Sequence, residues 1–286
     1  MFNNKFENKT ELLNQVSNLL RKELIDDPIS ESQIIIAYAA QKNTFNEVNI
    51  SNIDLETIKN IIEKRLKGKP LSKIINQKGF WKDIFYTNEN TLDPRADTEL
   101  LVENILIDYS KKKPSKLKFL DLCSGTGCVG ISLLNEFHNA SCDFIDISEE
   151  ALHVCMKNIN KFELNDRSNC YHSDLFMNYK NSCLEELDFI VCNPPYIPLS
   201  EYKKLNPETL YDPKISLIGG DNGTEFYKKI LDHLARTQFR GDIYFEIDPI
   251  ISEKLLQFLL EKEIKIVYKK EDYLKLDRLL KITLSS

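Results

Sequence analysis

Short apolar runs alternate with helix-like segments from Lys118 onward, and this alternation constrains the fold more than any other feature of the chain. Short apolar runs bounded by turn residues are typical of strands that are buried on both faces of a sheet. Strands that alternate with helices predict an α/β fold, with a mostly parallel sheet covered on both sides. The predicted strands lie at residues 118–123, 142–147, 169–174, 188–192 and 242–247.

The last two predicted strands differ from the others in their connection. IKIVYK (264–269) and LLKITL (279–284) are separated by the nine residues 270–278, which are too few for a helical crossover. We therefore expect this last pair to be antiparallel.

The first part of the chain has a helical pattern. Between residues 9 and 67, apolar side chains recur at intervals of three and four. The next segment, KGFWKDIFYTNENTLDPR, places aromatic residues around short turn signals and indicates a β-hairpin. The predicted organisation is a helical domain at 1–75, a linking hairpin at 76–93 and a larger α/β domain at 94–286.

The first predicted strand runs into the glycine-rich segment DLCSGTGCVG (121–130). Its glycines allow a tight turn and a close approach of the backbone to a ligand, and a helix is expected to begin near Cys128. Asp146 ends the second strand, 21 positions after Gly125, where an acid accepts hydrogen bonds from ribose hydroxyls. The pattern predicts a nucleoside-containing cofactor. The competing interpretation is that the glycines serve only the tight packing of helix on strand.

The fourth predicted strand ends in VCNPPYIP (191–198). A central strand cannot continue through Pro194 and Pro195, because proline has no backbone N–H and a fixed φ. Asn193 and Tyr196 are therefore expected at the carboxyl edge of the sheet, facing the same crevice as the glycine loop. The competing interpretation is a proline turn with a surface asparagine.

This tetrapeptide separates two kinds of cofactor chemistry. A dinucleotide oxidoreductase would use the glycine loop for a pyrophosphate and would leave the tetrapeptide unexplained. The Asn193 carboxamide oxygen and the Pro194 carbonyl can accept hydrogen bonds from one planar NH₂ group, and Tyr196 can lie against its flat face. Fixed acceptors favour a nitrogen that becomes tetrahedral and positively charged as it attacks the methyl group of S-adenosylmethionine. The pattern thus indicates a methyltransferase.

Two other segments allow more than one interpretation. Asp174, in HSDLF, is expected to end the third strand and to accept a hydrogen bond from an adenine amino group, with Leu175 packed on the ring. Asp174 is equally compatible with a helix N-cap. GGDNGTEF (219–226) resembles a phosphate loop, but no strand precedes it, so it predicts a turn before a helix.

The composition argues against several other classes of protein. No apolar run reaches the roughly 18 residues of a membrane span, and the beginning, MFNNKFENKTE, lacks signal and transit patterns. A net charge of −6 argues against electrostatic binding of nucleic acid by the chain as a whole. The seven cysteines form no C-x-x-C pair, so no metal is expected. We expect a cytoplasmic protein without a membrane anchor or a direct nucleic-acid partner.

Several segments, taken in order, resemble the HemK family, the protein-(glutamine-N5) methyltransferases that modify peptide chain release factors. The resemblance covers residues from about 55 to 281. Its segments are RLKGKPLSKIINQKGFW, LDPRADTELLVE, DLCSGTGCVGISLL, FIDISEEAL, HSDLF, LDFIVCNPPYIP, LIGGDNGTEFYKKIL and DRLLKI. The NPPY motif alone is shared with adenine-N6 methyltransferases, so the whole series is the more specific signal.

The resemblance implies a Rossmann-like class I methyltransferase domain that binds S-adenosylmethionine, preceded by a helical domain that helps to hold the release factor. The glutamine of the factor's Gly-Gly-Gln loop would reach the motif residues Asn193, Pro194, Pro195 and Tyr196. The implied cofactor-binding residues are Asp121, Cys123, Ser124, Gly125, Thr126, Gly127, Asp146, Ile147, Asp174, Leu175 and Asn193.

The chain departs from the family pattern at three places. Cys123 stands where many members have the first glycine of the loop, and Ala96 replaces the second proline of the PRP-[DE]-TE motif. The segment EIDPII (246–251) lacks the glycine and glutamine that commonly follow the strand-five glutamate, so we expect no function there.

Two alternatives to this function remain at the level of the sequence. An adenine-N6 methyltransferase acting on DNA or RNA would need a target-recognition region, but only 90 residues follow Tyr196 and the closing strands use most of them. A binding module that keeps the cofactor fold without catalysis is disfavoured because Asn193 and its neighbours are all present.

Overall fold

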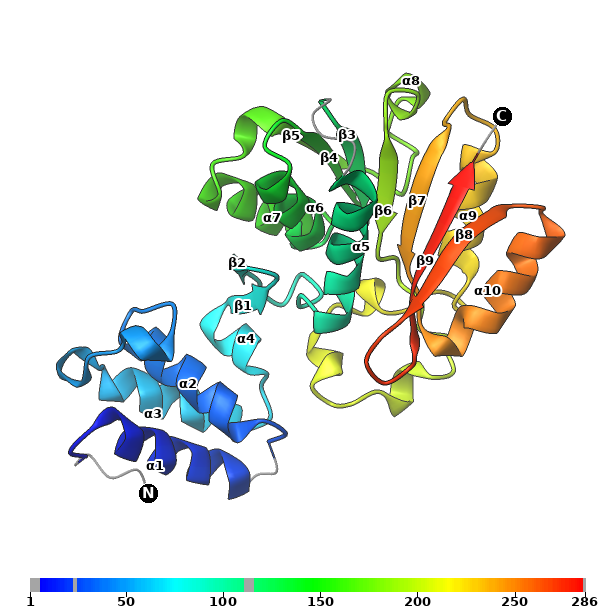
Figure 1. Cartoon of the computed structure of the whole chain (residues 1–286). Coiled ribbons are helices and arrows are strands. Elements are labelled where there is room, and N and C mark those ends of the chain that lie inside the picture. The colour runs from blue at the N-terminus through cyan, green and yellow to red at the C-terminus, as the bar shows by residue number, and fades with distance from the viewer. Residues whose placement is uncertain (1–5, 23–24, 111–115, 285–286) are drawn as a thin grey trace. The chain divides into compact units, whose positions relative to one another are not determined.

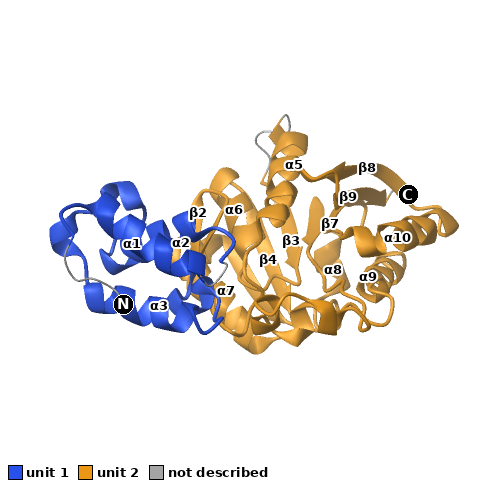
Figure 2. Cartoon of the chain, turned by 90° about the horizontal axis from the view of Figure 1, so that it is seen from below, with its two compact units in different colours: residues 1–77 blue, residues 78–286 orange. Residues whose placement is uncertain are grey.

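The computed structural model describes residues 6–22, 25–110 and 116–284. The chain forms two compact units, residues 1–77 and residues 78–286, which Figure 2 shows in blue and orange. Each unit contains an apolar core of its own.

The first unit is helical. Its elements are α1 (Lys9–Lys22), α2 (Pro28–Ala39), η1 (Phe45–Glu47), η2 (Ile50–Asn52), α3 (Leu55–Arg65) and α4 (Leu71–Ile75). Side chains at helical spacing, such as Leu12, Val16 and Ile58, are buried among these helices. Arg65 is also buried, and its Nε and Nη2 atoms donate to the two carboxylate oxygens of Glu31 at 2.7 and 3.0 Å. This paired geometry offsets the cost of burying the charge.

The second unit contains a hairpin and a seven-stranded sheet. The hairpin strands are β1 (Gln77–Phe80) and β2 (Asp83–Tyr86). The sheet strands are β3 (Lys118–Leu122), β4 (Ser141–Asp146), β5 (Ser168–His172), β6 (Phe189–Cys192), β7 (Gly241–Glu246), β8 (Lys265–Glu271) and β9 (Asp277–Leu284). Their order is β5-β4-β3-β6-β7-β9-β8, as Figure 1 shows. Strands β3 to β7 pair in parallel and β9 is antiparallel to β7 and β8, so the predicted fold class is confirmed.

Helices cover both faces of this sheet. They are α5 (Glu99–Tyr109), α6 (Cys128–Glu136), α7 (Glu149–Lys161), α8 (Asn181–Leu184), α9 (Glu225–Leu234) and α10 (Pro249–Glu261), with 3₁₀ turns η3 (Ala96–Thr98), η5 (Asn165–Arg167), η6 (Tyr202–Lys204), η7 (Thr209–Tyr211) and η8 (Lys214–Ser216). Phe119 of β3 packs in one cluster with residues of α5, α6 and α7, whereas Leu120 packs in another with residues of α8, α9 and α10. This alternation follows from the two-residue period of a strand.

The strand order brings three chain segments to one edge. β3 lies between β4 and β6, with Leu122 opposite both Ile145 and Cys192. The residues that follow these strands therefore leave the sheet side by side, at the point where ligands bind in open α/β sheets. Within the described ranges, no helix is long and apolar enough to cross a membrane.

Candidate active site

A cavity lies at the carboxyl edge of the sheet, where β3, β4 and β6 end. We call it the glycine-loop cavity. The predicted residues that line it are Asp121, Cys123, Ser124, Gly125, Thr126, Asp146, Ile147, Asp174, Leu175, Asn193 and Pro195. Of the other predicted residues, Gly127 and Pro194 are not part of its lining, and Tyr196 lines a second cavity.

Asp146 holds the glycine loop against the end of β4. Its Oδ2 accepts a hydrogen bond from the Gly125 N–H at 2.8 Å, and its Oδ1 accepts one from the Ser148 N–H at 2.9 Å. Burial raises the pKa of Asp146, while these backbone hydrogen bonds oppose the shift. Each carboxylate oxygen can accept a further hydrogen bond, so Asp146 retains acceptor capacity for ribose hydroxyls.

Position 127 requires a glycine, because of both its backbone conformation and its close neighbours. Its φ of +75° is left-handed, and a Cβ atom built there would lie 2.6 Å from Cys155 Sγ. Glycine therefore permits the loop to turn directly into α6, whose first residues, Cys128 and Val129, line the cavity.

The loop residues have polar groups that a ligand can satisfy. Ser124 is buried, and its Oγ has no hydrogen-bond partner among the described residues. A buried hydroxyl without a partner is destabilising, so a polar group of a bound cofactor would fit at this place. Nearby, Asp121 Oδ2 accepts from the Gly130 N–H at 2.9 Å, and burial raises the pKa of Asp121 to about 8.

Cys123 follows β3 in a left-handed conformation, with a φ of +63°. This conformation costs roughly 1–2 kcal/mol for a residue with a Cβ atom. Glycine has no such cost, which explains physically why glycine is common at the corresponding place in the HemK pattern. The half-buried Cys123 side chain lines the glycine-loop cavity.

The sequence predicted that Asp174 ends the third strand, and this prediction is wrong. β5 ends at His172, and Asp174 lies two positions later in an exposed turn. It does not begin a helix either, because the next helix is α8, which starts at Asn181. Its backbone carbonyl accepts from the Met177 N–H at 3.1 Å, and Leu175 follows with a φ of +48°. The turn still places both residues at the cavity wall.

Asn193 stands between two cavities. The second, which we call the Glu246 cavity, is lined by Glu246, Tyr196, Arg278 and Asp248 among others. Asn193 lines both cavities, whereas Pro195 lines only the first and Tyr196 only the second. The segment 193–198, which follows β6 through two prolines and which we call the proline exit, thus presents the Asn193 amide to both cavities. This arrangement suits a group that contacts two ligands at once.

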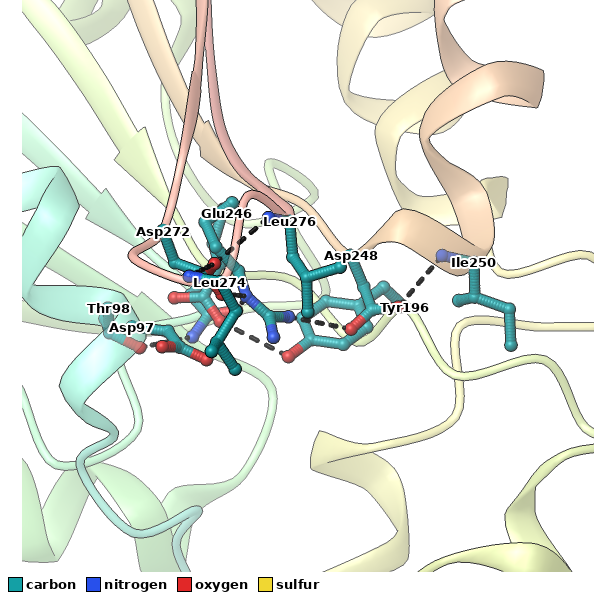
Figure 3. Close-up of polar contacts among 11 residues, drawn as sticks. Asp97, Thr98, Tyr196, Glu246, Asp248, Ile250, Asp272, Leu274 and Leu276 are labelled. Atoms are coloured by element: carbon teal, nitrogen blue, oxygen red, sulfur yellow. Dashed lines mark hydrogen bonds and ion pairs between the residues drawn. The ribbon is translucent and has the colours of Figure 1, made fainter.

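The charged residues that line the Glu246 cavity are two arginines, Arg95 and Arg278, and three acids, Asp97, Glu246 and Asp248. Arg278 Nη1 lies 2.9 Å from Asp248 Oδ2, and its Nε lies 3.2 Å from Asp97 Oδ2 and 3.0 Å from Asp272 Oδ2. Figure 3 shows these acids around the same space as Tyr196 and Glu246. Both arginines are paired with carboxylates, so this wall favours a ligand that donates hydrogen bonds over an anion.

Glycines from the GGDNG segment fix the backbone of the proline exit. The Gly219 N–H donates to the Ile197 carbonyl at 2.9 Å, and the Ile197 N–H donates to the Leu217 carbonyl at 2.9 Å. A Cβ atom on Gly219 would lie 2.5 Å from the Pro195 carbonyl oxygen and 2.7 Å from Tyr196 Cα. The segment precedes α9 in a turn, so its glycines serve close backbone packing.

Gly219→Ala should therefore disturb the proline exit. We expect a loss of about 1–3 kcal/mol in the free energy of unfolding, as for other overpacked sites, together with a slower reaction at the site. Denaturant unfolding and single-turnover rates measure the two effects. Gly79→Ala is the matched control, because nothing lies within 4 Å of a Cβ atom at Gly79. Unchanged stability and rate in Gly219→Ala would contradict the packing role.

Several lining residues have no role predicted from the sequence. Residues 90–95 and Thr98 line the glycine-loop cavity, and so do Phe226 and Lys229 of α9. Arg95 anchors the first of these segments, because its Nη2 lies 2.5 Å from Asp212 Oδ2. The motif LDPRADTE was a usable signal for this segment. The two residues of α9 lie in the segment LIGGDNGTEFYKKIL, which was a usable signal in the same way.

The chain is similar to known methyltransferases. Residues 88–206 match the family described as "Methyltransferase small domain". The "Release factor glutamine methyltransferase" of Leptospira interrogans is 32% identical over 259 residues, which cover 88% of this chain and 89% of that protein. The protein of the same name from Flavobacterium psychrophilum is 33% identical over 244 residues, covering 82% of this chain and 83% of that protein.

Other similar proteins are longer or share only the fold. The "Bifunctional methyltransferase" of Rickettsia conorii is 31% identical over 292 residues, and the chain spans 55% of its length. The solved structure of the hMettl16 catalytic domain in complex with MAT2A 3′UTR hairpin 6 has a TM-score of 0.55 at 14% identity, covering 71% of this chain and 76% of that chain. This likeness concerns the fold alone.

Proposed function

The chain belongs to the family of release factor glutamine methyltransferases, and from this premise we propose that it methylates the side-chain amide nitrogen N5 of a glutamine in a release factor. The glutamine is that of the factor's Gly-Gly-Gln motif. The place of Asn193 in the lining of both cavities is the observation that carries this proposal.

S-adenosylmethionine is the cofactor, and it supplies a methyl carbon made electrophilic by its sulfonium sulfur. The residues of the glycine-loop cavity suit it. Asp146 has acceptor capacity for the ribose hydroxyls, and the unpaired Ser124 hydroxyl suits a polar group of the cofactor. Asp174 and Leu175 suit the adenine, for which they offer a carboxylate and an apolar side chain.

The motif residues suit an amide nitrogen as the acceptor of the methyl group. Amide nitrogens are poor nucleophiles, because their resonance is strong enough to give a rotation barrier of roughly 18–20 kcal/mol. Asn193 Oδ1 and the Pro194 carbonyl would each accept one proton of the substrate NH₂ group, which stabilises the nitrogen as it gains positive charge. No strong base is needed, because the methylated nitrogen releases its extra proton to water. Tyr196 would lie against the amide plane.

Label transfer tests the proposal. The protein is incubated with methyl-labelled S-adenosylmethionine and, in separate reactions, with a release factor, the same factor carrying alanine in place of the motif glutamine, and duplex DNA. We expect label on the Gly-Gly-Gln glutamine, no label on the alanine variant and none on the DNA. Label on adenine would instead support the adenine-N6 alternative, and an unlabelled release factor would refute the proposed substrate.

Two further parts of the proposal concern the partner and the setting. The first unit would help to hold the release factor, as the resemblance implies. A release factor substrate also fits a cytoplasmic protein that needs no direct contact with nucleic acid.

A further inference from the structure

Four side chains from distant parts of the sequence form two hydrogen-bonded pairs that lie close together. Asn193 Nδ2 donates to Thr98 Oγ1 at 3.4 Å, and the Tyr196 hydroxyl donates to Glu246 Oε1 at 3.3 Å. The Thr98 side chain is also a hydrogen-bond neighbour of the Glu246 carboxyl group. Figure 3 shows Thr98 and Tyr196 approaching Glu246 from different elements. Both polar side chains of the NPPY motif are therefore linked to one carboxyl group.

The centre of this group of side chains is buried. Thr98 is 3% exposed and Glu246 is 2% exposed. Glu246 Oε2 is enclosed and accepts no well-formed hydrogen bond from the described residues. Thr98 Oγ1 accepts from Asn193, so its single proton remains to be donated. An ionised carboxylate only accepts hydrogen bonds, which makes Glu246 the fitting acceptor for that proton.

The direction of these hydrogen bonds decides which end of the Asn193 amide faces a substrate. An amide has an accepting oxygen at one end and a donating NH₂ at the other. With its NH₂ engaged by Thr98, Asn193 has Oδ1 left to present. A reversed amide would instead direct its NH₂ group at the substrate NH₂, where two donors oppose each other.

We propose that Thr98 and Glu246 are positioning residues that orient the Asn193 amide, so that Oδ1 accepts a proton of the substrate nitrogen. This inference rests on the proposed function and deepens it. No function was predicted for the segment that begins at Glu246. Under this proposal, Glu246 contributes to the reaction by orienting Asn193 through Thr98, without contacting the substrate. Thr98 has no competing structural role as a cap, since its side chain makes no capping hydrogen bond to α5.

Glu246 must be ionised to accept from both hydroxyl groups. Burial, helped by the charge of Asp97, raises the pKa of Glu246 to about 7, although hydrogen bonds from Thr98 and Tyr196 and the charge of Arg278 oppose the shift. Burial and the charge of Glu246 also raise the pKa of Tyr196, so Tyr196 stays a neutral donor. Among the described residues, the ionisable and charged groups around Glu246 include Arg95, Asp97, Cys128, Tyr196, Tyr227, Asp248 and Arg278.

The reaction should consequently depend on pH near neutrality. Below pH 7 the protonated Glu246 would donate a hydrogen bond to one of the two hydroxyls, and Thr98 would be free to donate to Asn193 Oδ1. We therefore expect kcat to rise with pH through about 7, the value to which the pKa of Glu246 is raised, and to level off above it.

Thr98→Val tests the inference directly, because valine keeps the shape and removes the hydroxyl. We expect kcat to fall about 10-fold to 100-fold, less than the roughly 10²–10³ typical of losing a group that contacts the transition state. The cofactor dissociation constant should change much less than kcat. Tm should fall above pH 7, because the ionised Glu246 loses one donor, so kcat is measured well below Tm. Thr98→Ser restores a hydroxyl and should restore most of kcat. A normal kcat in Thr98→Val, with wild-type protein active, would overturn the inference and leave the proposed function intact.

Glu246→Gln gives a second test that separates positioning from stability. The raised pKa makes folded protein lose stability as pH rises from the ordinary carboxyl range to about 7. Glutamine removes this ionisation, so Tm at pH 8 should equal or exceed that of wild type while kcat falls and loses its rise through pH 7. A lower Tm with an unchanged pH profile would assign Glu246 a structural role only.

A titration without substrate checks the hydrogen bond itself. In protein labelled with ¹³C at glutamate carboxyls, the Glu246 signal is identified by its loss in Glu246→Gln. We expect it to titrate near 7 in wild type and at higher pH in Thr98→Val, because the Thr98 hydrogen bond lowers the pKa of Glu246. Identical titrations would refute the Thr98 contact, whatever the substrate proves to be.

Discussion

Asn193→Ala should slow methyl transfer by at least about 10²-fold, the effect of removing one oriented polar group from a transition state. Alanine removes the oxygen that would accept a substrate proton, and it also leaves Thr98 Oγ1 without its donor. Single-turnover rates with a release factor and saturating S-adenosylmethionine measure the loss. Cofactor affinity should change little, because most of the lining of the glycine-loop cavity lies elsewhere.

Asn165→Ala is the matched control for this substitution. Asn165 is exposed, belongs to η5 and lines neither cavity. It should therefore have the wild-type rate. A near-normal single-turnover rate in Asn193→Ala would remove Asn193 from the reaction, and a large loss of cofactor affinity would show that it serves binding instead.

Asp146→Ala should weaken the binding of S-adenosylmethionine by about 1–3 kcal/mol, or roughly 5-fold to 140-fold in the dissociation constant. Two effects combine. The substitution removes the acceptor proposed for the ribose hydroxyls, and it frees the N–H groups of Gly125 and Ser148. Calorimetric titration of the protein with the cofactor measures the change.

The control for this effect is Asp166→Ala, in which an exposed acid of η5 is replaced. The net charge changes equally in the two variants, so a difference in affinity reflects the site itself. Unchanged affinity in Asp146→Ala would exclude Asp146 from cofactor binding.

Much of the fold followed from local patterns. The apolar runs that alternate with helix-like segments and the short connection between the last two strands indicated a parallel sheet with an antiparallel end. The observed strand order confirms this. Such patterns are reliable because strand period, turn chemistry and crossover length act over a few residues.

The errors and omissions concern places where local patterns give no information. Asp174 was expected to end a strand but lies in a turn two positions beyond β5. The glycines near Gly219 were attributed to a turn alone, although their backbone also packs against Pro195 and Tyr196. No pattern within GGDNG encodes the proximity of another backbone.

By itself, the sequence determined the sheet, the edge at which Asn193 emerges and the chemical family of the site. Only the tertiary structure decided which side chains form hydrogen bonds with Asn193 and Tyr196. Thr98 lies 95 positions from Asn193, and Tyr196 lies 50 positions from Glu246. Their meeting depends on how β6 and β7 pair and on where η3 leads into α5. Such contacts arise from the packing of whole elements, which no spacing within the chain records.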